Sequence, residues 1–351
     1  MSGLEVSICK KLGTFELEVS FQTENEILAI LGASGCGKSM TLKCIAGIET
    51  PDSGRIILNG RVLFDAEKRI NVAPQKRNIG YMFQDYALFP NMTVLANIMI
   101  ALRKCSRQER EQKAMELIRK FRLEGLEKQL PGQLSGGQKQ RTAMARMLAS
   151  EPELLLMDEP FSALDSHLKW ELEQEMKELL NQLGKTTLFV SHDRDEVCRI
   201  CDRVTCISGG RTEEPVGVRE FFEDPKTFAA ARLSGCKNIS AARRIDKRHL
   251  FAEDWNKELT LEKEIPEDIA FVGIRAHSFE PADTEGESAG PGNVFRTAEY
   301  RIMEELFEWD ILFRQENAVE WILWRVSKKQ WNPEKMPKYL TVGEKDILLL
   351  K

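Results

Sequence analysis

The stretch Gly32-Ala33-Ser34-Gly35-Cys36-Gly37-Lys38-Ser39 follows a short continuous apolar run, Ile27 to Leu31. Such a run is typical of a strand that is buried on both faces of a mostly parallel sheet. In a glycine-rich turn from strand to helix, small residues let the backbone wrap closely, and its N–H groups can face phosphate oxygens. We therefore predict a phosphate-binding loop in which Lys38 reaches the β- and γ-phosphates of a nucleotide and Ser39 binds Mg²⁺. The alternative is an accidental glycine-rich turn.

A second apolar run ends in two carboxylates, in the sequence Leu154-Leu155-Leu156-Met157-Asp158-Glu159. It predicts a buried strand that delivers both side chains at its C-terminal end, where ligands bind in open α/β sheets. We expect Asp158 to hold Mg²⁺, through water, and Glu159 to polarise the water that attacks the γ-phosphate. A solvated acidic turn would be the better interpretation if the phosphate-binding loop were absent.

A second anion-binding helix start is predicted at Leu134-Ser135-Gly136-Gly137-Gln138, which precedes an apparent helix from Gln138 to Ala149. Ser135 and the glycine amides could face an anion there. One ATP does not need two such cradles, but two become useful if two copies of the chain pair head to tail. Each copy would then close this segment over the nucleotide held by the other. The alternative is an ordinary helix cap.

The composition is that of an ordinary globular protein, with 351 residues of which 42% are hydrophobic and 30% charged. No apolar run approaches the length of about 20 residues that a membrane-spanning helix needs. The first residues have neither the basic start nor the apolar core of a secretory signal, so export is not expected. A formal net charge of −5 gives no general attraction to nucleic acid, and we expect no nucleic-acid partner.

The pattern along the chain predicts two domains. Apolar and polar residues alternate from Leu12 to Phe21, which indicates a β-hairpin or meander. Buried strands then alternate with helices to about residue 210, which favours an α/β domain with a largely parallel sheet. Beyond about Ser234 the pattern changes to short strand-like runs such as Trp309 to Arg314. We expect an α/β domain over residues 1–233 and a smaller, mainly β domain over residues 234–351.

Residues typical of helix ends predict two of the helices. Ser106-x-x-Glu109 is a capping-box pattern, and apolar residues recur at helical spacing from there to Phe121. Apolar residues also repeat at helical spacing from Leu168 to Leu183, and Gly184 is well placed to end that helix.

Taken in this order, the motifs resemble those of ABC transporter nucleotide-binding subunits, with residues 134–138 similar to the signature of that superfamily. The resemblance implies a P-loop NTPase fold of ABC type, with an antiparallel β subdomain and a helical subdomain beside the main sheet. It implies that Gln84 links Mg²⁺ and the attacking water to a membrane partner and that His192 contacts the γ-phosphate. It also implies that Ser162-Ala163-Leu164-Asp165 crosses a dimer interface.

The cofactors that the resemblance implies are ATP and Mg²⁺. Where the family usually has a second hydroxyl residue, this chain has Met40, which offers only its backbone N–H to the α-phosphate. Phe15 is the nearest candidate for an aromatic residue that stacks on adenine, although a core phenylalanine is an equal alternative. The expected nucleotide-contacting set is Gly32, Ala33, Ser34, Gly35, Cys36, Gly37, Lys38, Ser39, Met40, Phe15, Ser135, Gly136, Gly137, Gln138 and Asp165. The expected catalytic residues are Glu159, His192 and Gln84, and the expected Mg²⁺ ligands are Ser39, Gln84 and Asp158.

Residues 74–95 are similar to those of importers that use an extracytoplasmic binding protein. Gly235-Cys236-Lys237-Asn238 and Gly273-Ile274-Arg275-Ala276-His277 resemble the molybdate and sulfate import subfamily. The resemblance thus implies molybdate as the leading cargo, then sulfate or thiosulfate, then a sugar or polyamine. Arg275, Lys237 and His277 could instead be ordinary surface charges.

The partners implied are membrane permease subunits, a second copy of the chain and, indirectly, an extracytoplasmic oxyanion-binding protein. The chain would lie at the cytoplasmic face of the membrane. Two other classes of protein fit the sequence less well. A non-transport ABC ATPase acting on ribosomes or DNA usually carries two fused modules or a long coiled coil, and neither pattern is present. A sensor without turnover is disfavoured by Glu159 and His192.

Overall fold

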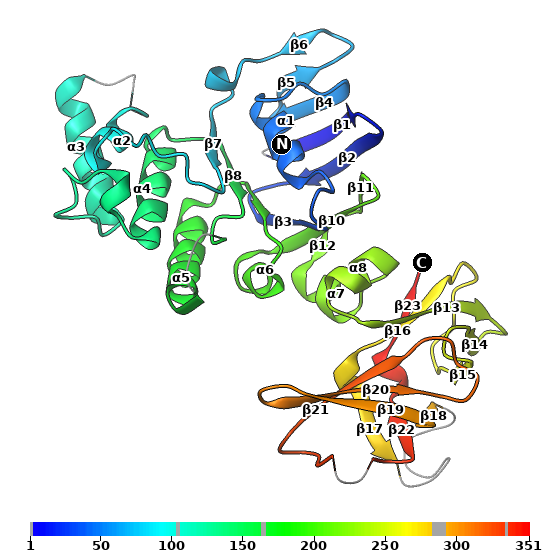
Figure 1. The fold of residues 1–351 in the computed structure, drawn as a ribbon. Helices are drawn as coiled ribbons and strands as arrows, with labels where there is room; N and C mark the ends of the chain where they lie inside the picture. Colours follow the sequence, from blue (N-terminus) through cyan, green and yellow to red (C-terminus); the bar gives the residue numbers. More distant parts are fainter. Residues whose placement is uncertain (1–2, 103–105, 163–165, 283–292, 334–335) are drawn as a thin grey trace. The chain divides into compact units, whose positions relative to one another are not determined.

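The computed structural model describes residues 3–102, 106–162, 166–282, 293–333 and 336–351. The chain divides into two compact units, Met1–Val218 and Arg219–Lys351. The first unit contains a mixed sheet with helices, and the second is built from antiparallel strands (Figure 1).

Within the described residues of the first unit, twelve strands form one sheet. In spatial order they are β6 (Ile70–Asn71), β5 (Arg61–Asp65), β4 (Ser53–Leu58), β1 (Leu4–Leu12), β2 (Phe15–Thr23), β11 (Arg211–Thr212), β10 (Arg203–Ser208), β3 (Ile27–Gly32), β9 (Thr187–Val190), β8 (Leu154–Asp158) and β7 (Ile79–Met82), with β12 (Val216–Gly217) paired to β10. The strands from β10 to β7 run parallel, and β1, β2, β4, β5 and β6 form an antiparallel part. The predicted hairpin is therefore present, as β1 and β2.

The strands that precede the two key motifs lie in the middle of the parallel part. Every residue of β3, β8 and β9 is buried, as their continuous apolar runs predict. Helix α1 (Lys38–Ala46) packs against these same strands. The C-terminal ends of β3 and β8 thus lie at one edge of the sheet, with the start of α1 beside them.

A buried arginine holds the C-terminal end of α1. Arg77 follows the short 3₁₀ turn η1 (Pro74–Lys76), and its guanidinium is fully buried. It donates to the carbonyl oxygens of Cys44 at 3.0 Å and Ile45 at 2.7 Å, and also to Val72 at 2.7 Å and to the side chain of Asn71 at 2.8 Å. A cation at this end satisfies helix carbonyls that lack partners within the helix.

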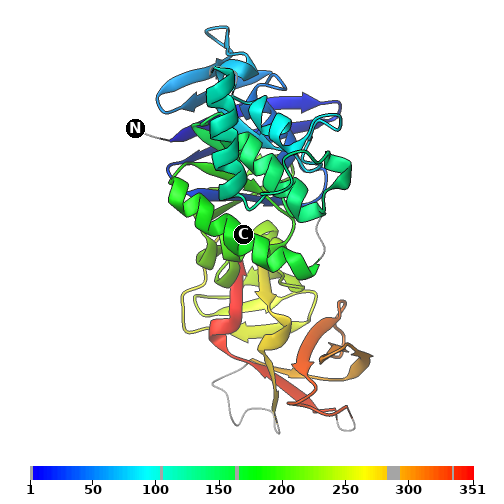
Figure 2. The ribbon, with the colours of Figure 1, turned by 90° about the vertical axis from the view of Figure 1, so that its left-hand side faces the viewer.

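Helices α2 (Val94–Met99), α3 (Arg107–Lys120) and α4 (Gly136–Ala149) lie together beside β7 and β8 (Figures 1 and 2). The short 3₁₀ turn η2 (Pro131–Gln133) precedes α4. The predicted capping box of α3 is present, since Ser106 N–H donates to Glu109 at 2.8 Å and Glu109 N–H donates back at 3.4 Å. These helices form the helical subdomain that the resemblance implies.

Helix α5 (Ser166–Leu183) ends where the sequence predicts. Gly184 has a φ of 56° and donates its N–H to the carbonyl oxygen of Leu180 at 3.1 Å. A single glycine in the left-handed conformation thus caps the C-terminus of this helix. Helix α6 (Arg194–Ile200) packs against α5 and is capped by Asp193.

Two short helices, α7 (Val218–Glu223) and α8 (Phe228–Leu233), belong largely to the second unit, whereas the sequence placed the domain boundary after residue 233. The guanidinium of Arg275 donates to the carbonyl oxygens of Phe222 and Ser234, at the ends of these helices. Because Arg275 follows a strand of the second unit, these bonds attach both helices to that unit.

Three antiparallel sheets make up the described strands of the second unit. They are β15 (Lys257–Thr260), β14 (His249–Ala252), β13 (Asn238–Arg244), β16 (Phe271–Ile274) and β23 (Ile347–Leu350); β17 (Phe279–Ala282), β22 (Tyr339–Val342) and β18 (Val294–Arg296); and β19 (Glu299–Glu304), β20 (Glu308–Arg314) and β21 (Ile322–Ser327). The 3₁₀ turns η3 (Ala276–Ser278) and η4 (Glu344–Asp346) connect strands. Phe279, Phe295 and Phe313 meet edge to face in the core, with ring centroids 5.4–6.3 Å apart.

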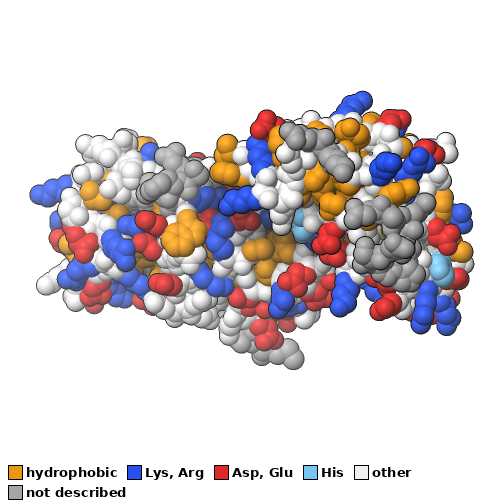
Figure 3. Space-filling model, turned by 90° about the horizontal axis from the view of Figure 1, so that it is seen from below, with side chains coloured by type: hydrophobic (Ala, Val, Ile, Leu, Met, Phe, Trp, Pro, Cys, Tyr) orange, Lys and Arg blue, Asp and Glu red, His pale blue; other side chains and the backbone are white. Residues whose placement is uncertain are grey.

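Apolar side chains are exposed at the turn between β19 and β20. Leu306 is 79% exposed and Phe307 is 75% exposed. Figure 3 shows hydrophobic side chains at the surface among charged ones on the face seen from below. In the described parts of the chain, no helix has both the length and the apolarity that crossing a bilayer requires.

Candidate functional site

The loop between β3 and α1 curls around the side chain of Lys38. Its ammonium group is buried and donates to the carbonyl oxygens of Gly32 at 2.9 Å and Ala33 at 3.0 Å. Ala33, Ser34 and Gly35 are exposed at the tip of the loop. The cation is therefore fixed inside a curl whose outer backbone faces solvent, as a phosphate-binding loop requires.

Two glycines are required by the geometry of this loop. A Cβ on Gly32 would lie 2.4 Å from the sulfur of Cys36 and 2.7 Å from the carbonyl oxygen of Ile207. Gly37 has a φ of 108°, and a Cβ there would lie 2.6 Å from the side chain of Leu17. Only glycine fits both positions without displacing neighbours.

Three side chains meet where α1, β7 and β8 come together. The hydroxyl of Ser39 donates to Asp158 Oδ1 at 2.9 Å, and the phenol of Tyr81 donates to Asp158 Oδ2 at 3.1 Å. Burial raises the pKa of the Asp158 carboxyl above its ordinary value, and the bonds from Ser39 and Tyr81 oppose that shift. Burial and the nearby Asp158 charge raise the pKa of Tyr81, so its phenol stays a donor.

Glu159 is the centre of a second group. Gln84 Nε2 donates to Glu159 Oε2 at 3.2 Å, and His192 Nδ1 lies 3.4 Å from the same oxygen. These residues come from three separate segments, after β7, β8 and β9. Glu159 has a φ of 48°, a left-handed conformation that is unusual for a residue with a side chain. Strained backbone of this kind is concentrated at functional sites.

The carbonyl of Pro160, the residue after Glu159, accepts two hydrogen bonds. Gln140 of α4 donates to it at 3.2 Å, and the phenol of Tyr86 donates at 3.3 Å. Both donors are buried. The backbone next to Glu159 is thus tied to the helical subdomain through α4.

The segment at residues 135–138 forms the predicted helix start. Ser135 Oγ accepts from Gln138 N–H at 3.3 Å, and Gln138 Oε1 accepts from Ser135 N–H at 2.9 Å. Gly136 begins α4 and is half-buried, whereas Gly137 is buried against Leu172. In Figure 1, α4 belongs to the helical group and lies away from α1.

The remaining residues that the sequence predicts to contact the nucleotide lie at different places in the first unit. Met40 and Phe15 are half-buried and pack against the core of the sheet, as does Cys36 of the loop. Leu17, which the sequence reasoning did not single out, is the β2 residue that contacts the loop glycine at position 37. Cys36 lies 4.0 Å from the Lys38 ammonium. Asp165 lies outside the described residues.

Tyr81, which donates to Asp158, is also absent from the site residues that the sequence predicts. A tyrosine in a strand of alternating pattern indicates a core aromatic residue, and its stacked contact with Phe83, 4.2 Å between centroids, fits that interpretation. The available signal was its place near the end of β7, three residues before Gln84, on a strand that borders the acidic strand β8.

The donor set fits Mg²⁺. In the described residues, no cluster of three or more His, Cys, Asp or Glu could hold a metal alone. Mg²⁺, however, commonly takes one or two protein oxygens together with substrate phosphates and water. Ser39 and Asp158 offer two hard oxygens beside the loop, and Gln84, which contacts the next residue, Glu159, has an amide oxygen of the same kind.

Comparison with known proteins agrees with this geometry. Residues 17–162 match the family model described as ABC transporter. The spermidine/putrescine import ATP-binding protein PotA of Vibrio cholerae is 41% identical over 251 residues, which cover 70% of this chain and 64% of the relative. PotA of Vibrio vulnificus is 40% identical over 260 residues, which cover 72% of this chain and 67% of the relative.

Two solved structures are also similar, a dimeric bacterial ABC transporter cassette and a dimeric post-hydrolysis state of an ATP-binding cassette with ADP and Pi bound. Each gives a TM-score of 0.52 at 31% identity and covers 62% of this chain and 99% of the solved chain. Fold and site together define a P-loop nucleotide-binding protein. The length and sequence identity of these matches also identify the family. The chain belongs to the ABC transporter family of ATP-binding proteins.

Proposed function

We propose that this chain is the ATP-hydrolysing subunit of an ABC importer and that Glu159 is the general base. The observation that carries the proposal is the convergence of Gln84 and His192 on one oxygen of Glu159, next to the pair formed by Ser39 and Asp158. A carboxylate held by two polar side chains at the end of a buried strand is well placed to orient a water molecule.

The positions of the site residues suggest a separate role for each group. Lys38 and the loop amides bind and orient the phosphates, and Ser39 and Asp158 hold Mg²⁺, which neutralises phosphate charge when bound. Gln84 and His192 fix the orientation of the Glu159 carboxylate, which takes a proton from the attacking water.

A head-to-tail dimer is part of the proposal. The chain has two anion-binding helix starts, at α1 and α4, and Figure 1 shows them apart in one copy. The similar solved cassettes are described as dimeric. In such a dimer, Ser135 and its glycines would close over the nucleotide bound by Lys38 of the other copy.

Replacement of Glu159 by glutamine tests the base. Glu159→Gln keeps the size of the side chain and leaves Lys38, Ser39 and Asp158 in place, so Mg-ATP should still bind. We expect kcat to fall by about a hundredfold or more and the variant to accumulate as an ATP-bound dimer. Steady-state ATPase assays and size-exclusion chromatography with ATP measure both effects. Wild-type turnover in the variant would refute the assignment of the base.

The cargo we propose is a polyamine, in place of the molybdate expected from the sequence. The matched relatives are named as spermidine/putrescine import proteins. Two of the residues in the segments that suggested an oxyanion have structural partners. Arg275 bonds the ends of α7 and α8, and buried Asn238 exchanges two hydrogen bonds with the backbone of Leu323, at 2.7 and 2.8 Å.

The partners then become membrane permease subunits and, indirectly, an extracytoplasmic polyamine-binding protein, with this chain at the cytoplasmic face. Uptake assays in the source cell test the cargo. Deletion of the gene should abolish high-affinity uptake of radiolabelled spermidine and leave molybdate uptake unchanged. Loss of molybdate uptake with normal spermidine uptake would restore the first expectation.

A further inference from the structure

Three charged side chains of α5 form one column against α6. Lys169, Glu173 and Lys177 are spaced four residues apart, so they share one face of the helix. Glu173 is buried and accepts from Arg199 Nε of α6 at 2.5 Å, and Lys177 donates to the carbonyl oxygen of Ile200 at the end of α6. These contacts hold the two helices in a fixed register, with Lys169 beside the N-terminal end of α6.

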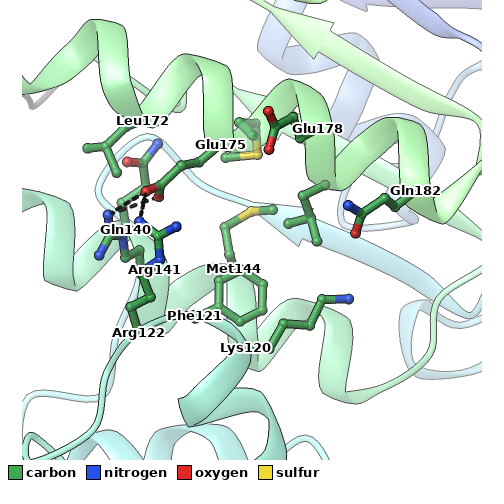
Figure 4. Close-up of a pocket in the computed structure, with 12 residues that line it drawn as sticks. Lys120, Phe121, Arg122, Gln140, Arg141, Met144, Leu172, Glu175, Glu178 and Gln182 are labelled. Carbon is green, nitrogen blue, oxygen red and sulfur yellow. Dashed lines mark hydrogen bonds and ion pairs between the residues drawn. The ribbon is translucent and has the colours of Figure 1, made fainter.

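Another face of α5 is tied to the helical subdomain. Glu175 pairs with Arg122 at 2.8 Å and with Arg141 of α4 at 2.9 Å, and Figure 4 shows these three side chains together. Leu172 of α5 lies against Gly137 at the start of α4. Because α5 is held on two faces, the backbone that carries Lys169 is well fixed.

Lys169 bridges two carboxylates at the start of α6. Its ammonium nitrogen lies 2.5 Å from Asp193 Oδ2 and 2.5 Å from Glu196 Oε1. The side chain of Glu196 is only 4% exposed, and Ser191 Oγ donates to its other oxygen at 2.5 Å. Burial lowers the pKa of Lys169, but its hydrogen bonds to Asp193 and Glu196 outweigh burial and raise the pKa above its ordinary value. Lys169 is therefore a cation that neutralises a buried carboxylate.

This network holds the chain on both sides of His192. Ser191 precedes His192 and Asp193 follows it, and the Asp193 N–H donates to Ser191 Oγ at 2.9 Å. The His192 side chain is 68% exposed, and its Nδ1 lies 3.4 Å from Glu159 Oε2. An exposed ring is little restrained by packing, so the backbone and hydrogen bonds around it must set the direction in which it points.

We propose that Lys169 is a positioning residue for ATP hydrolysis, which acts through Glu196, Ser191 and Asp193 to keep His192 directed at Glu159. This role rests on the ATPase activity proposed above and adds a residue that lies outside the nucleotide-binding motifs. Without the ammonium, Glu196 Oε1 becomes a buried acceptor that has lost its partner. The segment around His192 then rearranges to satisfy it.

Lys169→Met tests the role, because it keeps an unbranched side chain and removes the ammonium. We expect kcat for ATP to fall by about tenfold at unchanged KM, since Lys38, Ser39 and Asp158 still hold the nucleotide. Lys177→Met is the matched control, on the same helix and at similar exposure, 24% against 21%, but at the far end of α6. Its kcat should stay within about twofold of wild type. Equal losses in the two variants would overturn the proposal.

A double-mutant cycle shows whether the effect passes through His192. In a His192→Ala background, Lys169→Met should lower kcat by less than about twofold, because the group that it positions is already absent. A tenfold loss in both backgrounds would overturn the proposal. Lys169→Arg should retain most of the wild-type kcat, because a guanidinium can donate to both carboxylates.

A second readout does not need ATPase activity. The chain has four histidines, so ¹³C labelling at histidine Cε1 gives few NMR signals, and His192→Ala identifies the signal of His192. We expect that signal to shift in Lys169→Met and to stay in place in Lys177→Met. An unchanged His192 signal in Lys169→Met would overturn the positioning role. A wild-type chain without ATPase activity would refute the proposed function, whereas the shift would still test the position of His192.

Glu196→Gln tests the same link if Lys169→Met does not fold. Glu196 uses one oxygen for Lys169 and the other for Ser191, whereas an amide has a single oxygen, so one of the two bonds is lost. The His192 signal should shift in this variant too, with circular dichroism showing that the fold is retained. A folded Glu196→Gln with the wild-type His192 signal and the wild-type kcat would contradict the proposed link.

Discussion

Tyr81 and Ser39 approach the two oxygens of Asp158 from opposite elements, one from a strand and one from a helix. Their hydrogen bonds favour the charged carboxylate against the effect of burial, which raises the pKa of Asp158. The charged form of Asp158, which is the form that would bind Mg²⁺, is therefore favoured by a phenol that is not among the proposed Mg²⁺ ligands.

Removal of that phenol should weaken Mg²⁺ binding. Tyr81→Phe takes away a bond that lowers the pKa of Asp158, so the pKa rises further and protonation competes better with Mg²⁺. We expect the Mg²⁺ concentration for half-maximal ATPase activity to rise about fivefold at pH 6 and less at pH 8. Tyr86→Phe is the control, because its phenol contacts Pro160 instead. Identical Mg²⁺ dependence in wild type and Tyr81→Phe would contradict this role.

At the scale of elements, the end of α1 depends on a residue that follows it by some thirty positions in the chain. Arg77 closes the last turn of the helix that begins with Lys38 and Ser39. A fork with several donors is needed there, because four acceptors surround one buried side chain.

Arg77→Lys should therefore be far from conservative. Lysine keeps the charge but cannot reach four acceptors, so buried carbonyls lose partners. We expect the free energy of unfolding of the first unit to fall by about 2–4 kcal/mol, measured by urea titration with circular dichroism. Arg61→Gln, which removes one exposed bond to the Lys76 carbonyl, should change it by less than about 0.5 kcal/mol. A loss as small as that in Arg77→Lys would show that the lysine is accommodated.

Elements with local signals were predictable. The capping box before α3, the glycine after α5 and the apolar runs of β3 and β8 each carry their own physical cause in adjacent residues. The residues from Arg296 to Ile302 predict one short strand, but the structure divides them between β18 and β19. Thr297 bonds to the backbone of Lys338, far along the chain, and no local pattern contains that partner.

In the site, too, the residues that belong to local motifs were predictable and those with distant partners were not. Lys38, Ser39, Asp158 and Glu159 stand in motifs whose chemistry can be deduced from the residues alone. Their partner Tyr81 depends on how two strands meet, so the sequence did not reveal it. The molybdate expectation was based on the segments that contain Asn238 and Arg275, and both residues make structural hydrogen bonds that no local pattern shows.

At the scale of the whole molecule, the second unit contains an ion pair that we expect to make its stability depend on pH. Asp310 is buried in β20 and accepts two hydrogen bonds of 2.6 Å from Arg325 of β21. Hydrogen bonding from Arg325 lowers the pKa of Asp310 below its ordinary value. A carboxyl with a lowered pKa stabilises the fold above its unfolded pKa, and this contribution is lost as the pH falls through the folded pKa.

Asp310→Asn should destabilise the second unit by about 2 kcal/mol at pH 7, because it leaves Arg325 without its bidentate partner. The difference from wild type should begin to shrink below about pH 4, the ordinary pKa of this carboxyl in the unfolded chain, and should continue to shrink as the pH falls through the lowered folded pKa. Tryptophan fluorescence can report the transition, since five of the six tryptophans lie in this unit. A difference that stays constant from pH 7 to pH 3 would rule out the ion pair as its source.

The left-handed backbone of Glu159, with its φ of 48°, sets stability against turnover at a single position. A side chain in that conformation costs about 1–2 kcal/mol, a strain that glycine would relieve. On the proposed role of Glu159 as general base, Glu159→Gly is expected to be a more stable protein that does not hydrolyse ATP. A laboratory selection for heat resistance alone should then enrich inactive variants at this codon, whereas a selection for transport should retain the strained glutamate. With that role, stability is given up at this position in exchange for turnover.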